Sequence, residues 1–214
     1  MEFINENDPT LKRTMHLPHS LRKNIIQFVT FSEKDSVPEY ILKRWKYELQ
    51  LLKDSPAGGS QLSSMIAEMN DAVQWKTRRR ELATRIEKYC HTYQSGGRFG
   101  DPNIAQIILD ALRFKESQGL IELLAWSIMP NHVHLMWLLN HTTCGKVLGP
   151  MKSFTAKRIN EYCHSSGSVY MPDYYDVDIC YEKQFYRVLQ YILDNPSNGA
   201  GNPLFTGAKE NLVW

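Results

Sequence analysis

The chain has 214 residues, 43% of them hydrophobic, and is long enough to bury one sizeable core with room for an appended element. Its formal charge of +2 and pI of about 8.3 permit nucleic-acid binding but do not indicate it, so such binding has to be argued from local clusters. No stretch approaches about eighteen apolar residues and the N-terminus has no signal-peptide pattern, so we expect neither a membrane span nor export.

The four cysteines are scattered along the chain and form no C-x-x-C pair. This spacing argues against a zinc ribbon and against a disulfide framework. We therefore expect a protein of the reducing cytoplasm.

The N-terminal part predicts an arm, a strand and a helix. Residues 1–23 are polar and interrupted by prolines, which predicts a flexible arm with a docking segment at residues 16–19, whose two histidines, His16 and His19, we expect to be solvated. The β-branched and aromatic residues 25–31 predict a first strand. Apolar residues at helical spacing predict a helix over residues 39–53.

A helical insertion is expected over about residues 54–93. Turn-forming residues at 54–60 precede a stretch without Pro or Gly, within a single domain of residues 24–200 that is followed by a C-terminal tail, residues 201–214. Basic side chains gather in the insertion, among them Arg78, Arg79 and Arg80. They indicate either a solvated helix face with i,i+4 ion pairs or a set of DNA-phosphate contacts.

The middle of the chain predicts a helix and a hairpin. Asp101 and Pro102 are typical of a helix start, and apolar residues follow at helical spacing. The nearly continuous apolar residues 120–129 predict a strand, which the Pro-Asn pair at 130–131 turns into a second strand, residues 132–139. We expect these two strands to pair antiparallel.

The second strand carries His132 and His134. Successive side chains of a strand point to opposite faces, so these two histidines share one face, and Val133 and Leu135 take the other. Two neutral imidazoles on one face can bind a divalent metal, without choosing which metal. The alternative interpretation is a pair of buried or solvated histidines without a metal.

Two later segments carry candidate DNA contacts. Residues 149–164 predict a helix with Lys152, Lys157 and Arg158 largely off its apolar face, where they are candidates for phosphate contacts. The aromatic residues of 169–179 end in a strand-like piece and fit either base stacking or a place in the core.

The last predicted helix runs from Glu182 to about Asn195 and ends before Pro196. Tyr191 and Asn195 lie one turn apart on its polar flank, together with Arg187. Taken alone, Tyr191 fits a tyrosine at the edge of the core.

Three short sequences occur together: Pro-Asn-His-Val-His at 130–134, Lys-Ser-Phe-Thr-Ala-Lys at 152–157 and Tyr-Ile-x-x-Asn-Pro at 191–196. In this combination the chain resembles the single-tyrosine HUH transposases, specifically the REP-associated tyrosine transposase branch. The resemblance covers most of the chain, including His-Leu-Pro-His at 16–19 and Phe-Val-Thr-Phe at 28–31.

The resemblance implies an α+β fold, with a ferredoxin-like antiparallel sheet of four or five strands and helices packed on it. It makes His132, His134 and Asn195 the ligands of a divalent metal, Mg²⁺ or Mn²⁺, and Tyr191 the nucleophile. Attack by Tyr191 would give a 5′-phosphotyrosyl link and a free 3′-hydroxyl, which can reverse the attack on the same or another strand.

The implied partner is single-stranded DNA beside an imperfect hairpin. The resemblance is compatible with a homodimer, and the sequence does not decide between monomer and homodimer. The family pattern also has an arginine in the segment that corresponds to residues 170–177, which is missing here. The corresponding phosphate contact is either lost here or supplied by Arg187.

Two other functions remain open. A domesticated protein would bind hairpin DNA without cutting it. A metal-dependent phosphoesterase would use His132 and His134 without a covalent intermediate.

Overall fold

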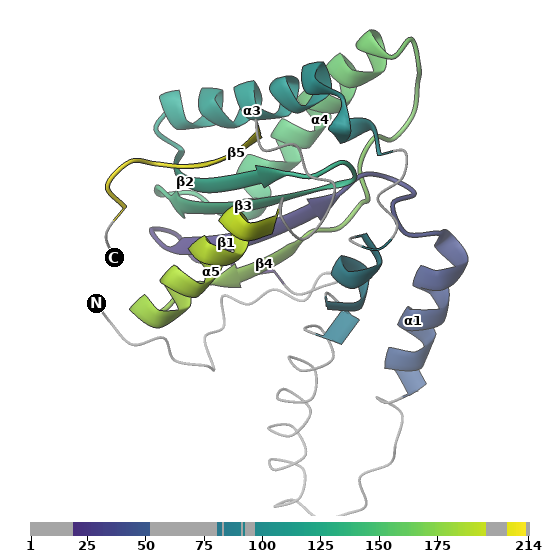
Figure 1. Cartoon of the computed structure of the whole chain (residues 1–214), viewed down its shortest axis with the longest axis horizontal. Helices are drawn as coiled ribbons and strands as arrows, with labels where there is room; N and C mark the ends of the chain where they lie inside the picture. The colour runs from purple at the N-terminus through teal and green to yellow at the C-terminus, as the bar shows by residue number, and fades with distance from the viewer. Residues whose placement is uncertain are drawn as a thin grey trace, which may run out of the picture. The chain divides into compact units, whose positions relative to one another are not determined.

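The structure is a computed structural model that describes residues 19–51, 81–82, 84–90, 92, 97–195 and 205–212. It divides into two compact units, one of residues 37–93 and one of the remaining chain. The larger unit contains a five-stranded sheet (Figure 1). The strands are β1 (Ile26–Ser32), β2 (Ile121–Ile128), β3 (His132–Leu139), β4 (Tyr175–Asp178) and β5 (Thr206–Ala208).

All neighbouring strands pair antiparallel in the order β4-β1-β3-β2-β5. The first four strands therefore have the order 4-1-3-2, which is that of the ferredoxin-like β-α-β-β-α-β arrangement. This confirms the predicted α+β class with a ferredoxin-like antiparallel sheet. The predicted hairpin is also confirmed, with an irregularity in β2 between Leu123 and Ala125.

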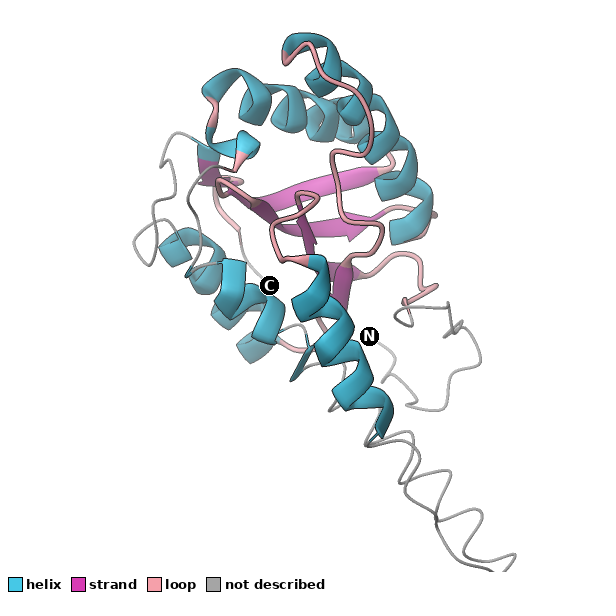
Figure 2. Ribbon diagram, turned by 90° about the vertical axis from the view of Figure 1, so that its right-hand side faces the viewer, coloured by secondary structure: helices cyan, strands magenta, loops and turns pink. Residues whose placement is uncertain are grey.

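Helices cover both faces of this sheet (Figure 2). On one face lie α3 (Pro102–Ser117), which follows the short 3-10 helix η1 (Arg98–Gly100), and α4 (Cys144–Tyr162). On the other lies α5 (Glu182–Asp194), which contacts β2 and β3. The α3–α4 face buries Val133, Leu135 and Trp137 of β3. The α5 face buries Met136 of the same strand against Phe185 and Ile192.

Local sequence explains where α3 begins, whereas core contacts set the start of α4. Asp101 is the N-cap of α3, where its carboxylate accepts the backbone N–H of Asn103 at 2.8 Å, and Pro102 occupies the first turn. Helix α4 starts at Cys144, five residues before the predicted start at residue 149, and contains Pro150. The earlier start buries Cys144, Val147 and Leu148 in the core, and this apolar contact outweighs the hydrogen bond that Pro150 cannot make.

The last strand was not predicted from the sequence, which indicated no element after Asn195. β5 has only three residues and pairs with β2, where Thr206 Oγ1 lies 3.0 Å from Ser127 Oγ. Three residues are too few for a periodic hydrophobic pattern.

The smaller unit contains α1 (Glu39–Leu51) and helical residues between 81 and 92. Arg85 donates to Glu48 at 2.7 Å and to Glu81, four residues before it, at 2.6 Å. Such exposed pairs fit the solvated-face interpretation of this basic segment. Arg78, Arg79 and Arg80 lie outside the described residues, as do residues 1–18 of the predicted arm.

Among the helices that the structure describes, none combines the length and the apolar character needed to cross a bilayer.

Candidate active site

His132 and His134 lie side by side on the face of β3 that α5 covers. Both side chains are almost fully buried, at 1% and 0% exposed, and their ring centroids are 4.6 Å apart. The sheet register places Thr30 of β1 opposite His134 and Ser32 opposite His132. The period of two along the strand thus gives the predicted shared face.

Each histidine ring is held through its Nδ1 atom. His132 Nδ1 lies 2.7 Å from Oδ1 of Asn131, the residue before the strand. His134 Nδ1 lies 2.8 Å from Oγ1 of Thr30. In both rings the contacts fix the plane of the imidazole and turn Nε2 away from the bonded partner.

Helix α5 brings Tyr191 to this pair. The Tyr191 hydroxyl is 3.3 Å from Nε2 of His134, and the two rings are 5.3 Å apart. Phe28 of β1 packs against both rings, at 5.6 Å from His134 and 5.9 Å from Tyr191. Phe185 and Ile192 anchor the same helix in the core, and this orients Tyr191 toward the sheet.

Asn195 ends the same helix and is 1% exposed. Within the described part of the chain, neither its Oδ1 nor its Nδ2 has a hydrogen-bond partner. A buried carboxamide without a partner costs roughly 1–3 kcal/mol, so this side chain is suited to bind a group that the described residues do not supply.

These side chains fit a divalent metal. Imidazole nitrogens and a carboxamide oxygen are donors of the kinds that divalent cations accept. Among the described residues, no cluster of three His, Cys, Asp or Glu side chains is arranged for a metal.

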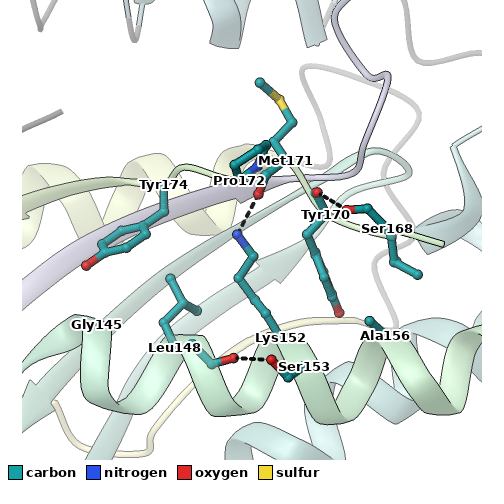
Figure 3. Close-up of a pocket in the computed structure, with 12 residues that line it drawn as sticks. Gly145, Leu148, Lys152, Ser153, Ala156, Ser168, Tyr170, Met171, Pro172 and Tyr174 are labelled. Carbon is teal, nitrogen blue, oxygen red and sulfur yellow. Dashed lines mark hydrogen bonds between the residues drawn. The ribbon is translucent and has the colours of Figure 1, made fainter. Parts of the chain in front are cut away.

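Lys152 occupies a different place from the other candidate cations of α4. It lines a pocket of about 320 Å³ between α4 and residues 168–174, where its Nζ donates to the carbonyl oxygen of Met171 at 2.7 Å (Figure 3). Nζ also lies 5.5 Å from the centroid of the Tyr170 ring. Burial lowers the pKa of Lys152 to about 8.

The remaining candidate DNA contacts lie on two helices. Lys157 and Arg158 are exposed on α4, where Arg158 also donates to Glu161 at 3.2 Å. Arg187 is exposed on α5, one turn before Tyr191. Because α4 and α5 cover opposite faces of the sheet, the structure brings Arg187 to the helix of Tyr191 and leaves the cations of α4 on the other side.

The prediction that His19 is solvated is wrong. Its ring stacks on Tyr174 with centroids 3.7 Å apart, and its two nitrogens lie 2.6 Å from Asp176 and 3.0 Å from Asp173. Burial disfavours the imidazolium, but the hydrogen bonds and charges of the two aspartates outweigh it and raise the pKa of His19. The acidic residues after position 172 were a signal that sequence reasoning did not connect with the arm.

Sequence reasoning also missed the roles of Thr30 and Asn131. Thr30 lies far from His134 in sequence, and only the register of β1 against β3 brings the two together. Asn131 was assigned to the turn, although its place directly before His132 was visible.

The chain is similar to one family model and to solved structures of transposases. Residues 97–195 match the family model described as "Transposase IS200 like". Among solved structures, a REP-associated tyrosine transposase bound to a REP hairpin is 13% identical, with a TM-score of 0.44, covering 86% of this chain and 73% of that chain. A putative transposase from Deinococcus radiodurans R1 is 14% identical, with a TM-score of 0.40, covering 85% of this chain and 95% of that chain. No curated protein matches the sequence.

Proposed function

Residues 97–195 match the model of the IS200-like transposase family, and from this match we propose that the protein is a transposase of that kind, which cleaves and rejoins single-stranded DNA through Tyr191. The observation that carries the proposal is the position of the Tyr191 hydroxyl, 3.3 Å from His134, on the helix that also ends in Asn195. A nucleophile and three candidate metal ligands thus come from two elements that pack together within one chain.

In this proposal His132, His134 and Asn195 hold a divalent cation, Mg²⁺ or Mn²⁺. When bound, the cation neutralises charge on the scissile phosphate and polarises its phosphorus–oxygen bonds. The three residues suit the task because the strand and the helix end are fixed by the core on either side of them.

Tyr191 performs the covalent step. Its phenol oxygen attacks the phosphorus, the bond from phosphorus to the 3′-oxygen breaks, and the 3′-oxygen takes up a proton while the phenol loses one. The products are a 5′-phosphotyrosyl link and a 3′-hydroxyl. Attack by that hydroxyl, or by one from another strand, reverses the step and rejoins DNA without an external energy source.

A phenol with an ordinary pKa of about 10 is a weak nucleophile at neutral pH. Its oxygen has to be held beside positive charge while the proton leaves. Arg187, one turn before Tyr191 on α5, is the nearest candidate in sequence on that helix and takes the place of the arginine missing from residues 170–177.

The proposed substrate is a single strand beside a hairpin. Exposed cations bind DNA phosphates and release counterions, which suits Lys157 and Arg158 on α4. Unpaired bases beside a stem can leave the stack, so a strand of this kind can reach the half-buried Tyr191 more easily than a duplex can.

A labelled single strand carrying a hairpin, incubated with the protein and Mn²⁺, tests the proposal. We expect a covalent protein–DNA adduct that survives denaturing electrophoresis and is abolished by Tyr191→Phe and by a chelator. Tyr186→Phe, on the exposed side of the same helix, is the matched control and retains the adduct.

The other outcomes identify the alternatives. Binding of the hairpin by the wild type without any cleaved product would indicate a DNA-binding protein that no longer cuts. Hydrolysis that survives Tyr191→Phe would indicate a phosphoesterase without a covalent intermediate.

A further inference from the structure

The contact between Asn131 and His132 decides which nitrogen of the ring carries the proton. A neutral imidazole has one N–H and one nitrogen lone pair. The Oδ1 atom of Asn131 can only accept a hydrogen bond, and it lies 2.7 Å from Nδ1 of His132. The proton of a neutral His132 is therefore on Nδ1, and the lone pair is on Nε2.

The contact of His134 differs in kind. Its partner at 2.8 Å is the Thr30 hydroxyl, which can either donate or accept. Thr30 fixes the plane of the His134 ring but permits both tautomers. Of the two residues that contact the histidine Nδ1 atoms, Asn131 and Thr30, only Asn131 dictates a tautomer.

Asn131 itself is held from three directions. Its backbone carbonyl accepts the N–H of Glu33 at 2.8 Å, and the preceding carbonyl, of Pro130, accepts the N–H of Phe99 at 3.0 Å. A side chain at Gly97 would place its Cβ 2.0 Å from the Pro130 oxygen and 2.9 Å from Asn131 Cβ, so only glycine fits there. The Pro130–Asn131 turn is thus enclosed by residues on both sides.

An ion pair fixes that enclosure. The buried carboxylate of Glu33 accepts the backbone N–H of Arg98 at 2.8 Å and also bonds to its guanidinium Nε. Glu33 therefore bonds to the Pro130–Asn131 turn through its backbone N–H. Its side chain bonds to Arg98, the first residue of η1. A buried carboxylate with these partners is costly to displace, which makes the position of Asn131 well defined.

We propose that Asn131 is a positioning residue that holds His132 as the Nδ1–H tautomer and directs its Nε2 lone pair into the site, with the Glu33–Arg98 pair holding Asn131 in place. The tautomer follows from contacts within the protein alone. Its consequence for metal affinity rests on the proposed function, in which Nε2 of His132 is a ligand.

Nitrogen-15 NMR of the metal-free protein at a pH where His132 is neutral tests the tautomer. We expect the two-bond nitrogen–proton pattern of an Nδ1–H ring for His132, and loss of that pattern in Asn131→Ala. Asn131→Asp keeps an acceptor beside Nδ1 and retains the pattern. Asn160→Ala, on the outer part of α4, is the matched control and leaves it unchanged.

An Nε2–H pattern in the wild type, or an Asn131→Ala spectrum in which His132 is unchanged, overturns the proposal. The spectra of the other histidines report whether the variant is folded, so an unfolded variant is recognised. If Asn131→Ala is unfolded, Glu33→Gln is measured instead. This variant keeps the backbone contact and removes the carboxylate, and we expect it to leave His132 in a mixture of tautomers.

Calorimetric titration with Mn²⁺ tests the consequence. We expect Asn131→Ala to weaken binding about 10- to 100-fold, and Asn131→Asp to stay within a few-fold of the wild type. Equal weakening by both substitutions contradicts a positioning role. If the wild type binds no Mn²⁺, the metal part of the proposed function fails, whereas the NMR result on the tautomer still stands or falls alone.

Discussion

The two faces of the sheet bury different kinds of side chain from the same strand. Toward α3 and α4, β3 presents Val133, Leu135 and Trp137, which join a large apolar cluster. Toward α5 it presents the two imidazoles, beside a smaller apolar cluster and the carboxamide of Asn195. The apolar face supplies the free energy of folding, and this allows the α5 face to keep buried polar groups that cost stability.

The largest effect is expected on the apolar face. Trp137→Ala removes a fully buried ring and leaves a cavity, so the free energy of unfolding falls by about 3–5 kcal/mol. Urea titration followed by circular dichroism measures the loss. A loss below about 1 kcal/mol would contradict the assignment of stability to this face.

On the α5 face, we expect one substitution to weaken metal binding without lowering the free energy of unfolding. Asn195→Leu replaces a buried carboxamide that has no partner among the described residues by an apolar side chain of similar size, so the free energy of unfolding stays equal or rises by up to about 2 kcal/mol. The same substitution removes a proposed ligand, and Mn²⁺ affinity falls at least about tenfold.

Asn160→Leu, on the outer part of α4, is the control for this substitution and leaves Mn²⁺ affinity unchanged. If Asn195→Leu destabilised the protein strongly, its carboxamide would have a structural partner, and the separation of stability from binding on this face would fail.

His19 makes the free energy of unfolding depend on pH. Its two carboxylate partners favour the imidazolium, and its pKa is raised, so this stabilisation is fully present below about pH 6.5 and is lost as the pH rises through the raised folded-state pKa. His19→Phe keeps the stacking on Tyr174 and removes the charge.

We expect His19→Phe to lower the free energy of unfolding by about 1–3 kcal/mol at pH 5.5 and by less at pH 9. Urea titrations of both proteins at the two pH values measure the difference. A cost that is constant or grows with pH would show that the carboxylates do not hold a charged His19.

The smallest effect is expected from the exposed cations. Arg158→Gln removes one proposed phosphate contact, so we expect hairpin DNA to bind a few-fold more weakly and the slope of log affinity against log salt to fall by about 0.7–0.9. Fluorescence anisotropy at several salt concentrations measures both. Arg113→Gln on α3 is a matched cation control, and an equal change there would assign the effect to overall charge.

Much of this arrangement follows from local patterns. The period of two along residues 132–139 predicts which face receives His132 and His134, and helical spacing predicts that Tyr191 and Asn195 share a flank. These patterns are local, so they are visible in the sequence. The start of α4 was misplaced because the core contacts of Val147 and Leu148 override the usual effect of Pro150.

The partners of the site are not local. The contact from Thr30 to His134 depends on the register of β1 against β3, and that from His19 to Asp176 joins the two ends of the chain. Neither leaves a periodic signal. The sequence therefore predicted the candidate site residues, but not the side chains that orient them.

The most direct test of the central claim is to identify the amino acid that carries the DNA. The adduct formed with a hairpin-bearing single strand and Mn²⁺ is digested with nuclease and protease, and the modified peptide is sequenced by mass spectrometry. The account predicts a single phosphonucleotide-bearing residue, Tyr191. Modification of another tyrosine, such as Tyr186 on the exposed side of α5, would contradict it.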